Sequence, residues 1–217
     1  DYIIPKPFDP RLISTVPVAV AKAAINSGVA SVSIENWDKY SRDLDKRKGN
    51  DDRIIRLIRA KAKLDPKKII YTEADRLDVL KAAQIVYEEG IAEPILMGRV
   101  ERIKKLMKEI DFEHKLKIID LSLEKSKNKI KRFGKIFHKQ RKDKGLTLSQ
   151  AVKLLRTRDY FASMMVKLGE ADALVSGYSR SYPEVIKPVL KVIGKGKGVR
   201  KIAATNLMLT SKGPIFL

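Results

Sequence analysis

Ala171-Asp172-Ala173-Leu174-Val175-Ser176-Gly177-Tyr178-Ser179-Arg180-Ser181-Tyr182-Pro183 is the stretch of sequence that decides the fold. Its apolar first part predicts a buried strand, its middle predicts a small polar loop, and Pro183 opens a helical pattern. The first turn of a helix carries unpaired N–H groups and the positive end of the helix dipole, which both favour a bound anion. The stretch therefore predicts a site for a phosphorylated ligand. The alternative is an ordinary strand-to-helix connection in which Ser181 only caps the helix.

The same alternation of strands and helices extends over most of the chain. Apolar runs predict strands at residues 67–72, 94–97, 115–121, 173–176 and 200–210. Helical periodicity predicts helices at residues 53–63, 76–89, 100–110, 125–142, 148–168 and 183–193. We therefore expect an α/β fold with a largely parallel sheet flanked by helices, in which ligands bind outside the carboxyl ends of the strands.

The N-terminal quarter has a different pattern and predicts a separate domain. After a Pro-rich lead-in, residues 16–27 predict a buried helix and residues 34–44 predict a second one, with Trp37 and Tyr40 at helical spacing. The charged run at residues 45–52 contains Gly and Asn and predicts a linker. We expect two domains, residues 1–50 and residues 51–217. Because the chain starts without Met and stops inside an apolar run, we also expect it to be a piece of a longer protein.

The composition excludes several classes of protein. The chain has 217 residues and is 44% hydrophobic, which is enough for a sizeable core. It has no cysteine, which excludes disulfides and thiolate metal sites, and its two histidines are too few for a His-rich metal site. No apolar run approaches the roughly 20 residues that cross a bilayer. We expect a cytoplasmic protein with no membrane partner.

The net charge of +20 raises the affinity for polyanions. The basic residues are mostly lysines that alternate with Glu and Asp along helical patterns, and aromatic residues make up only 6%. A surface for stacking nucleic-acid bases is therefore not predicted. Solvated lysine-rich helix faces explain the charge better than a specific nucleic-acid partner.

Two stretches resemble known families. Ile4-Pro5-Lys6-Pro7-Phe8-Asp9-Pro10-Arg11-Leu12, with the small residues at 19–24 and 27–30, resembles the closing segment of the malic enzyme oxidoreductase domain. Residues 53–217 resemble phosphotransacetylases, on the motifs Arg141-Lys142-Asp143-Lys144-Gly145-Leu146-Thr147, Tyr160-Phe161-Ala162-Ser163-Met164-Met165-Val166 and Gly169-Glu170-Ala171-Asp172-Ala173-Leu174-Val175-Ser176-Gly177. The order of the two is similar to that in the hybrid NADP-dependent malic enzymes of bacteria. The resemblance implies the phosphotransacetylase fold, which is like that of isocitrate and isopropylmalate dehydrogenases, with its first lobe and the start of its second.

The resemblance also implies a function. The C-terminal domain of the hybrid enzymes is regulatory, so the resemblance implies binding of acetyl-CoA or CoA as an allosteric effector and self-association through this domain. The parent enzyme would decarboxylate malate oxidatively to pyruvate with NADP and a divalent metal, Mg or Mn, neither of which is expected in this fragment. The alternative function is an active phosphate acetyltransferase, which moves acetyl between CoA and phosphate.

The expected ligand site combines the loop with basic residues from two helices. By the resemblance, Arg141 matches an arginine of the acyl-phosphate and CoA site, and Lys187 stands where the family has a phosphate-binding arginine before proline. A lysine keeps the charge but loses the bidentate geometry. The full set predicted to bind acetyl-CoA or phosphate is Arg141, Lys144, Ser176, Gly177, Ser179, Arg180, Ser181 and Lys187. Favourable charge at a helix C-terminus explains Arg141 and Lys144 equally well.

Several features speak against catalysis in this fragment. Tyr178 adds bulk where the family loop has alanine, and the family's remaining catalytic groups, a Ser-Arg pair and an aspartate, are expected beyond Leu217. We therefore assign no catalytic residue. Thr72, Glu73 and Asp75 follow a predicted strand end and are candidates to line the cleft, although a helix cap is the favoured role for Asp75. We expect His138 to lie on the surface, and Met164 and Met165 to pack in the core. Two further rivals stay open, a domain that only holds an oligomer together and a general polyanion binder.

Overall fold

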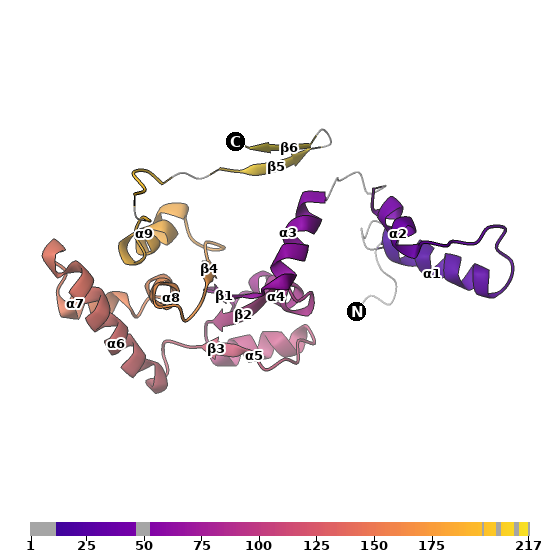
Figure 1. Ribbon diagram of the computed structural model, residues 1–217. Coiled ribbons are helices and arrows are strands. Elements are labelled where there is room, and N and C mark those ends of the chain that lie inside the picture. The colour runs from indigo at the N-terminus through magenta and orange to yellow at the C-terminus, as the bar shows by residue number, and fades with distance from the viewer. Residues whose placement is uncertain (1–11, 47–52, 197, 203–204, 211–212, 217) are drawn as a thin grey trace. The chain divides into compact units, whose positions relative to one another are not determined.

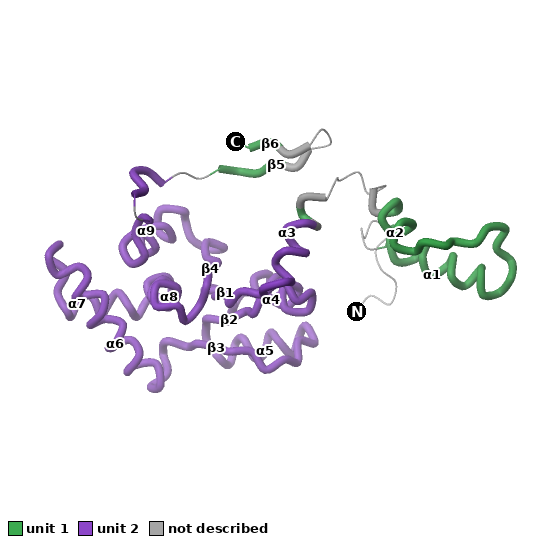
Figure 2. The backbone as a smooth tube through the Cα atoms, in the orientation of Figure 1, with its two compact units in different colours: residues 1–56, 203–217 green, residues 57–202 purple. Residues whose placement is uncertain are grey.

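The computed structural model describes residues 12–46, 53–196, 198–202, 205–210 and 213–216 (Figure 1). The chain forms two compact units, Asp1–Arg56 with Ala203–Leu217, and Leu57–Ile202 (Figure 2). The predicted Pro-rich lead-in and most of the predicted linker lie outside the described residues. The expected boundary near residue 50 stays a prediction.

The larger unit is built on a four-stranded parallel sheet in the order β3-β2-β1-β4. The strands are β1 (Lys67–Tyr71), β2 (Ala92–Met97), β3 (Lys117–Ile119) and β4 (Ala173–Val175). The helices are α3 (Arg53–Leu64), α4 (Leu77–Glu88), α5 (Val100–Glu109), α6 (Glu124–Arg141), α7 (Leu148–Leu154), α8 (Arg158–Lys167) and α9 (Tyr182–Val192), with a short 3-10 turn η1 (Lys142–Lys144). The predicted fold class is therefore confirmed.

Each face of the sheet carries its own hydrophobic core, because successive side chains of a strand point to opposite faces. Ile70, Ile95 and Met97 pack with buried side chains of α6, α7 and α8. Tyr71 and Leu96 pack with α4 and α5. Met164 and Met165 are fully buried in the first core, as expected. Helices on both faces explain why the carboxyl-terminal residues of β1, β2 and β3 are apolar.

The order of the strands reverses direction between β1 and β4. The chain proceeds from β1 to β2 to β3 on one side and then places β4 on the other side of β1. In open α/β sheets such a reversal leaves a crevice beyond the carboxyl ends of the two strands, and ligands bind there. The residues that follow β1 and β4 therefore occupy the place where the fold itself predicts a site.

Two predicted elements differ from the structure. The helix expected at residues 148–168 is two helices, because Leu155 ends α7 and Thr157 adopts an extended conformation before α8. The hydroxyl and the backbone N–H of Thr157 both donate to the carbonyl of Leu154 and fix this break. The strand expected at residues 200–210 is shorter, since β5 covers only Leu207–Thr210.

The smaller unit contains α1 (Leu12–Asn26), α2 (Trp37–Lys46) and an antiparallel hairpin of β5 and β6 (Gly213–Phe216). The rings of Trp37 and Tyr40 meet edge to face, 6.1 Å apart. The prediction that the first helix is buried is wrong for the described residues, since none of α1 is buried. Contact with one neighbouring helix, α2, covers only part of its surface.

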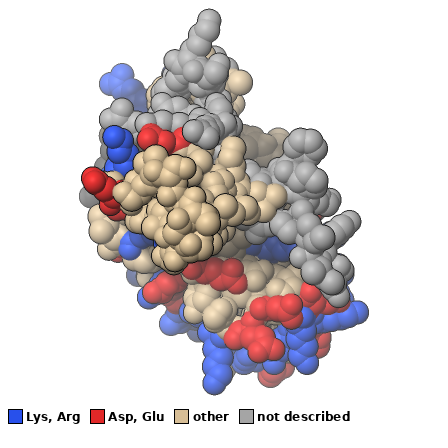
Figure 3. Space-filling model, turned by 90° about the vertical axis from the view of Figure 1, so that its right-hand side faces the viewer, with Lys and Arg blue, Asp and Glu red and all other residues tan. Residues whose placement is uncertain are grey.

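The surface mixes charges of both signs. On the face in Figure 3, side chains of Lys and Arg lie next to those of Asp and Glu rather than in separate patches. Among the described residues, no helix combines the length and apolar character that crossing a membrane requires.

Candidate anion-binding site

The loop between β4 and α9 wraps around a carboxylate of the protein itself. The backbone N–H groups of Gly177, Tyr178 and Ser179 donate to Oε2 of Glu73 over 3.3, 2.8 and 3.3 Å. The Ser179 hydroxyl donates to Oε1 of the same carboxylate. Glu73 follows β1 and is only 5% exposed. Gly177 has a φ of +99°, which suits glycine and lets the successive N–H groups converge. The N–H groups of the loop therefore converge on one acceptor, which is the carboxylate of Glu73 rather than a ligand, and the prediction of a phosphate site here stays a prediction.

The surroundings favour the charged form of Glu73. Burial of this carboxyl opposes its ionisation, but the hydrogen bonds from Ser179 and Tyr178, with the Arg180 guanidinium nearby, outweigh burial and hold the pKa of Glu73 below its usual range. At neutral pH the loop therefore surrounds a full negative charge. A second anion at the same N–H groups would meet both repulsion and a lack of free donors.

Two other predicted residues of the loop pair with Asp159. Ser176 Oγ donates to Asp159 Oδ1 over 2.8 Å, and Arg180 forms an ion pair with Asp159 Oδ2. Asp159 lies in the first turn of α8 and is 2% exposed. The break before α8 starts this helix at Arg158 and places Asp159 in its first turn. The sequence analysis did not identify Asp159. The signal was an adjacent Arg-Asp pair at the start of an otherwise apolar segment.

Arg158, the neighbour of Asp159, holds the end of β1 in place. Its guanidinium makes two 2.7 Å hydrogen bonds to the carboxylate of Asp75 and a 3.2 Å bond to the carbonyl of Thr72. Burial opposes ionisation of Asp75, but Arg158 outweighs it and lowers the pKa of this carboxyl. The expectation that Asp75 caps a helix is wrong, because Arg76 occupies the cap position of α4 and no side chain caps that helix.

The remaining predicted residues of this region are Ser181, which precedes the first residue of α9, and Lys187, in the middle of that helix. Ser181 donates through its N–H and its hydroxyl to the Glu184 carboxylate, over 2.9 and 2.7 Å. Lys187 is exposed, one turn further on. The helix begins at Tyr182 and runs through Pro188 to Val192.

A pocket of about 390 Å³ lies beside the loop and is acidic rather than basic. Tyr71, Val79, Ala82 and Val175 give it apolar walls, and its charged lining residues are Glu73 and Asp78. The Tyr178 hydroxyl donates to Asp78. This lining suits an apolar or cationic group better than a phosphate.

Arg141 and Lys144 lie at the other end of α9. Arg141 Nε donates to the carbonyl of Lys191 over 3.0 Å, and Lys191 stands in the last turn of α9. This helix has 11 residues, so about 16 Å separate its two ends. The structure therefore brings Ser176, Gly177, Ser179, Arg180 and Ser181 together. It separates Arg141 and Lys144 from them.

Two adjoining pockets open around Arg141, Lys144 and Lys191, with volumes of about 250 and 440 Å³. We call them the α9 C-terminal pockets. The smaller is lined by Phe137, Arg141, Lys144, Gly145, Leu146, Gln150, Leu154 and Lys191. The larger adds Gln140, Lys167, Leu190, Val192, Ile193, Gly194, Lys195 and Ile202. No acidic side chain stands among these described lining residues.

His138, which the sequence predicts to lie on the surface, is partly exposed. Its Nδ1 lies 2.8 Å from the carbonyl of Leu146, beside the smaller of these pockets. In the part of the chain that the structure describes, no cluster of three His, Asp or Glu residues is arranged to hold a metal ion.

Comparison with known proteins matches the fold and much of the sequence. Residues 53–217 match the phosphate acetyl/butaryl transferase family. The whole chain is 36% identical to part of an NADP-dependent malic enzyme of Haemophilus influenzae, and 71% of it is 34% identical to a phosphate acetyltransferase of Thermoanaerobacterium thermosaccharolyticum. A solved phosphotransacetylase of Streptococcus pyogenes aligns with a TM-score of 0.62 and 31% identity, over 72% of this chain and 46% of that one.

The chain spans only part of each of these relatives, 29% of the malic enzyme and 46% of the acetyltransferase. The matched part of the malic enzymes is their C-terminal region. With three quarters of its length in the match, the chain belongs to the phosphate acetyl/butaryl transferase family, in the form that resembles the C-terminal region of NADP-dependent malic enzymes.

Proposed function

We propose that this chain is the regulatory phosphotransacetylase-like domain of a malic enzyme and that it binds acetyl-CoA or CoA as an effector. The observation that carries the proposal is the pairing of open cationic pockets at one end of α9 with a self-filled anion site at the other. The similarity to malic enzymes over the whole chain supports the choice of parent protein.

The α9 C-terminal pockets fit the chemistry of CoA. CoA carries phosphates at its nucleotide end and a long, weakly polar pantetheine arm. Arg141, Lys144 and Lys191 line both pockets and offer charge for phosphates, while Phe137 and Leu154 give the smaller pocket apolar walls for the arm. Arg141 keeps guanidinium N–H groups beyond the one that binds the Lys191 carbonyl, since a guanidinium has five donors.

The hydrogen bonds that the β4–α9 loop makes within the protein disfavour the alternative function, an active phosphate acetyltransferase. Glu73 uses the three N–H groups of the loop, and the charge of Arg180 is matched by Asp159, so a substrate phosphate would have to displace Glu73 and compete with Asp159 there. Lys187 cannot offer the two-pronged contact of an arginine. The proposed domain thus retains the fold of a transferase and uses a different part of it. Full-length protein with acetyl-CoA and phosphate should form no acetyl phosphate.

Regulation requires that the effector bind two states of the parent enzyme with different affinity. In the proposed parent, the oxidoreductase part converts malate to pyruvate with NADP and Mg or Mn, and this domain self-associates. Acetyl-CoA at the α9 C-terminal pockets would then shift the oligomer between states of different malic enzyme activity.

Calorimetry on the full-length protein tests the proposal. We expect acetyl-CoA to bind, to change malic enzyme activity, and to bind at least tenfold more weakly to Arg141→Gln. The matched control is Lys139→Gln, an exposed lysine of the same helix that lines neither pocket. If millimolar acetyl-CoA gave neither binding heat nor thermal stabilisation, the domain would not bind this ligand and the proposal would be wrong. Sedimentation over a range of protein concentrations tests self-association.

A further inference from the structure

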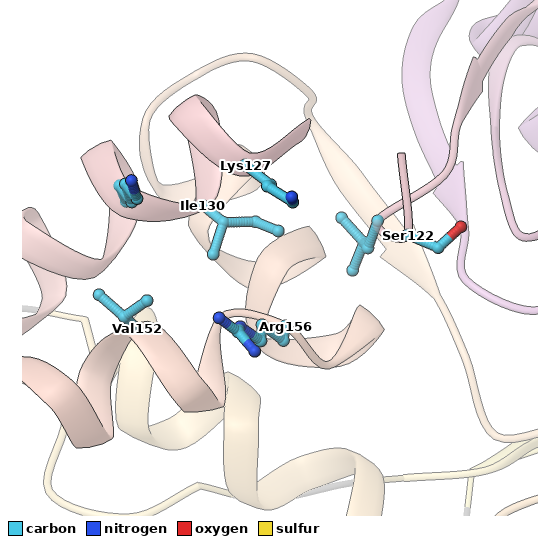
Figure 4. Close-up of a pocket in the computed structure, with 7 residues that line it drawn as sticks. Ser122, Lys127, Ile130, Val152 and Arg156 are labelled. Atoms are coloured by element: carbon cyan, nitrogen blue, oxygen red, sulfur yellow. The ribbon is translucent and has the colours of Figure 1, made fainter. Parts of the chain in front are cut away.

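We infer that the domain has a second ligand site, beyond the carboxyl end of β3, for a small organic dianion with an apolar body. The site is a pocket of about 480 Å³ between the β3–α6 connection, the first half of α6, and α7 with the turn that follows it (Figure 4). Its lining residues are Leu121, Ser122, Lys127, Ile130, Lys131, Val152 and Arg156. We call it the α6–α7 pocket. It shares no residue with the α9 C-terminal pockets or with the pocket at the loop.

The floor of the α6–α7 pocket is apolar. Leu121, Ile130 and Val152 supply it, and Ile130 is 4% exposed. One end is closed because α6 and α7 touch at Gly134, where a Cβ atom would lie 2.6 Å from Val152 Cγ2. A concave site with mostly apolar walls and a few polar groups is the usual form of a small-molecule site, and 480 Å³ is within the usual range of volumes.

Three cations surround this floor, and no acidic side chain is among its described lining residues. Lys127 and Lys131 are four residues apart on α6 and so share one side of the helix. Arg156 follows α7, and in Figure 4 Ile130 lies between it and Lys127. Charges of one sign around low-dielectric walls concentrate the field and attract counter-ions.

The charges favour a dianion. Lys127 already pairs with the exposed Glu124. Lys131 and Arg156 form no ion pair with any carboxylate of the described residues, which leaves two positive charges to be matched. An organic anion gains twice, since its charge meets these cations and its body covers the apolar floor. An inorganic ion gains only the first contribution.

Ser122, the uncharged polar residue among the lining residues, does not alter the preference for a dianion. Ser122 donates through its N–H and its hydroxyl to Asp120, over 2.9 and 2.6 Å, so its hydroxyl proton is not offered to a ligand. Asp120 is 4% exposed and also accepts the N–H of Val100 over 3.1 Å. These donors stabilise the negative charge of Asp120, which is not itself a lining residue of the pocket. Recognition at this pocket therefore rests on Lys131 and Arg156 together with the apolar floor.

Phenyl phosphate is the probe that matches this chemistry, and inorganic phosphate and phenol are its two halves. We expect calorimetry or NMR titration of the full chain to show phenyl phosphate binding at millimolar concentration or below, at least tenfold more tightly than either half. Arg156→Gln and Lys131→Gln should each weaken it at least fivefold. Lys135→Gln is the matched control, because this lysine is exposed one turn further along α6 and does not line the pocket.

Two results would overturn the proposal. One is that phenyl phosphate binds no more tightly than inorganic phosphate. The same conclusion follows if it does not bind at about 10 mM, a concentration well above the millimolar affinity that we expect. The other is binding that Arg156→Gln leaves unchanged while Arg141→Gln or added acetyl-CoA abolishes it, which would place the probe in the α9 C-terminal pockets. Thermal unfolding of each variant shows whether a loss of binding is a loss of folded protein. Failure at the α6–α7 pocket leaves the acetyl-CoA proposal intact, and the reverse holds as well.

Discussion

The two ends of α9 differ in what their charges are free to do. At the first turn the sequence offers a glycine loop, two serines and an arginine, and the structure commits them to Glu73, Asp159 and Glu184. At the last turn Arg141, Lys144 and Lys191 surround open pockets whose described lining residues include no carboxylate. The loop end has the geometry of an anion site, but carboxylates of the protein already occupy it. The other end has open cationic pockets but no phosphate-binding loop.

This difference shows that a loop's shape does not by itself locate a ligand. An anion binds where positive charge and N–H donors lack an internal partner, and a buried carboxylate satisfies them permanently.

Asp75→Ala should give the largest change, a loss of about 3 kcal/mol in the free energy of unfolding. Without the carboxylate, the half-buried Arg158 keeps its charge but loses its bidentate partner. The expected loss is at the low end of the range for breaking a buried ion pair, because both side chains of this pair are partly exposed. Urea denaturation of the full chain measures it. Glu113→Ala, which removes an exposed carboxylate from a loop, controls for the change in net charge. Acetyl-CoA affinity should not change; a large loss of affinity in folded Asp75→Ala would mean that the loop end takes part in binding.

Glu73→Ala should cost about 1–3 kcal/mol and make the loop a phosphate site. The three N–H groups of Gly177, Tyr178 and Ser179 lose their acceptor, and an added anion can replace it. We expect millimolar phosphate to raise the melting temperature of Glu73→Ala more than that of the wild type. Glu73→Gln keeps an acceptor oxygen and should lose less stability and gain less from phosphate. Equal responses of all three proteins would show that Glu73 does not compete with an anion.

The contribution of Glu73 should also depend on pH in a defined direction. Its folded-state pKa is lowered, despite burial, by the hydrogen bonds of the loop, so its stabilising contribution is present above the unfolded pKa of about 4.3 and is lost as the pH falls through the lower folded value. The difference in stability between wild type and Glu73→Gln should therefore be constant above about pH 5.5 and shrink below it. A difference that is flat down to pH 3 would contradict a charged Glu73 at the loop.

Local patterns in the sequence predict the fold but not the pairing of its charges. The run Ile95-Leu96-Met97 is buried in β2, as its apolar residues predict. The segment at residues 173–193 folds as the predicted strand, loop and helix, but the prediction of a buried strand is wrong for β4, because Ala173 and Val175 are exposed at the edge of the sheet. Glu73 meets the loop from 104 residues away. Which carboxylate meets which donor depends on strand order, and the reversal between β1 and β4 is set by packing rather than by any local pattern.

The separation of Arg141 from the loop has the same cause. In the sequence, Arg141 and Arg180 are both cations near predicted helix ends, and nothing local tells which end of α9 each one approaches. The tertiary fold decides it, because α9 packs mainly against α8 and its last turn meets Arg141, which donates to the Lys191 carbonyl 50 residues away. The charged start of α8 is different. Arg158-Asp159 before an apolar run is a visible signal of buried charge and of a helix start, and it could have revealed both the break and the network.

Lys144→Gln removes a charge from the α9 C-terminal pockets, and Lys187→Gln removes the same charge from the middle of α9, outside those pockets. If phosphates of acetyl-CoA bind at the last turn, Lys144→Gln should weaken binding about fivefold, close to 1 kcal/mol, because an exposed lysine contributes modestly. Lys187→Gln should leave the affinity within twofold. Calorimetry on both variants measures this. The reverse order of effects would move the effector away from the α9 C-terminal pockets and toward Lys187, the position that the resemblance to the family assigns to phosphate.

Ser181→Ala should give the smallest change, a loss of about 0.5 kcal/mol in stability with no change in acetyl-CoA affinity. Its hydroxyl donates to Glu184 and its N–H to the same carboxylate, so it closes the first turn of α9 and leaves no proton for a ligand. Thr147→Ala is the matched comparison, because the Thr147 hydroxyl caps α7 by accepting the Gln150 N–H and Gln150 lines the smaller α9 C-terminal pocket. Urea denaturation should show similar losses for both. If Ser181→Ala weakened acetyl-CoA binding more than Thr147→Ala did, the serine would bind the ligand as well as cap the helix, and the first turn of α9 would not be fully committed.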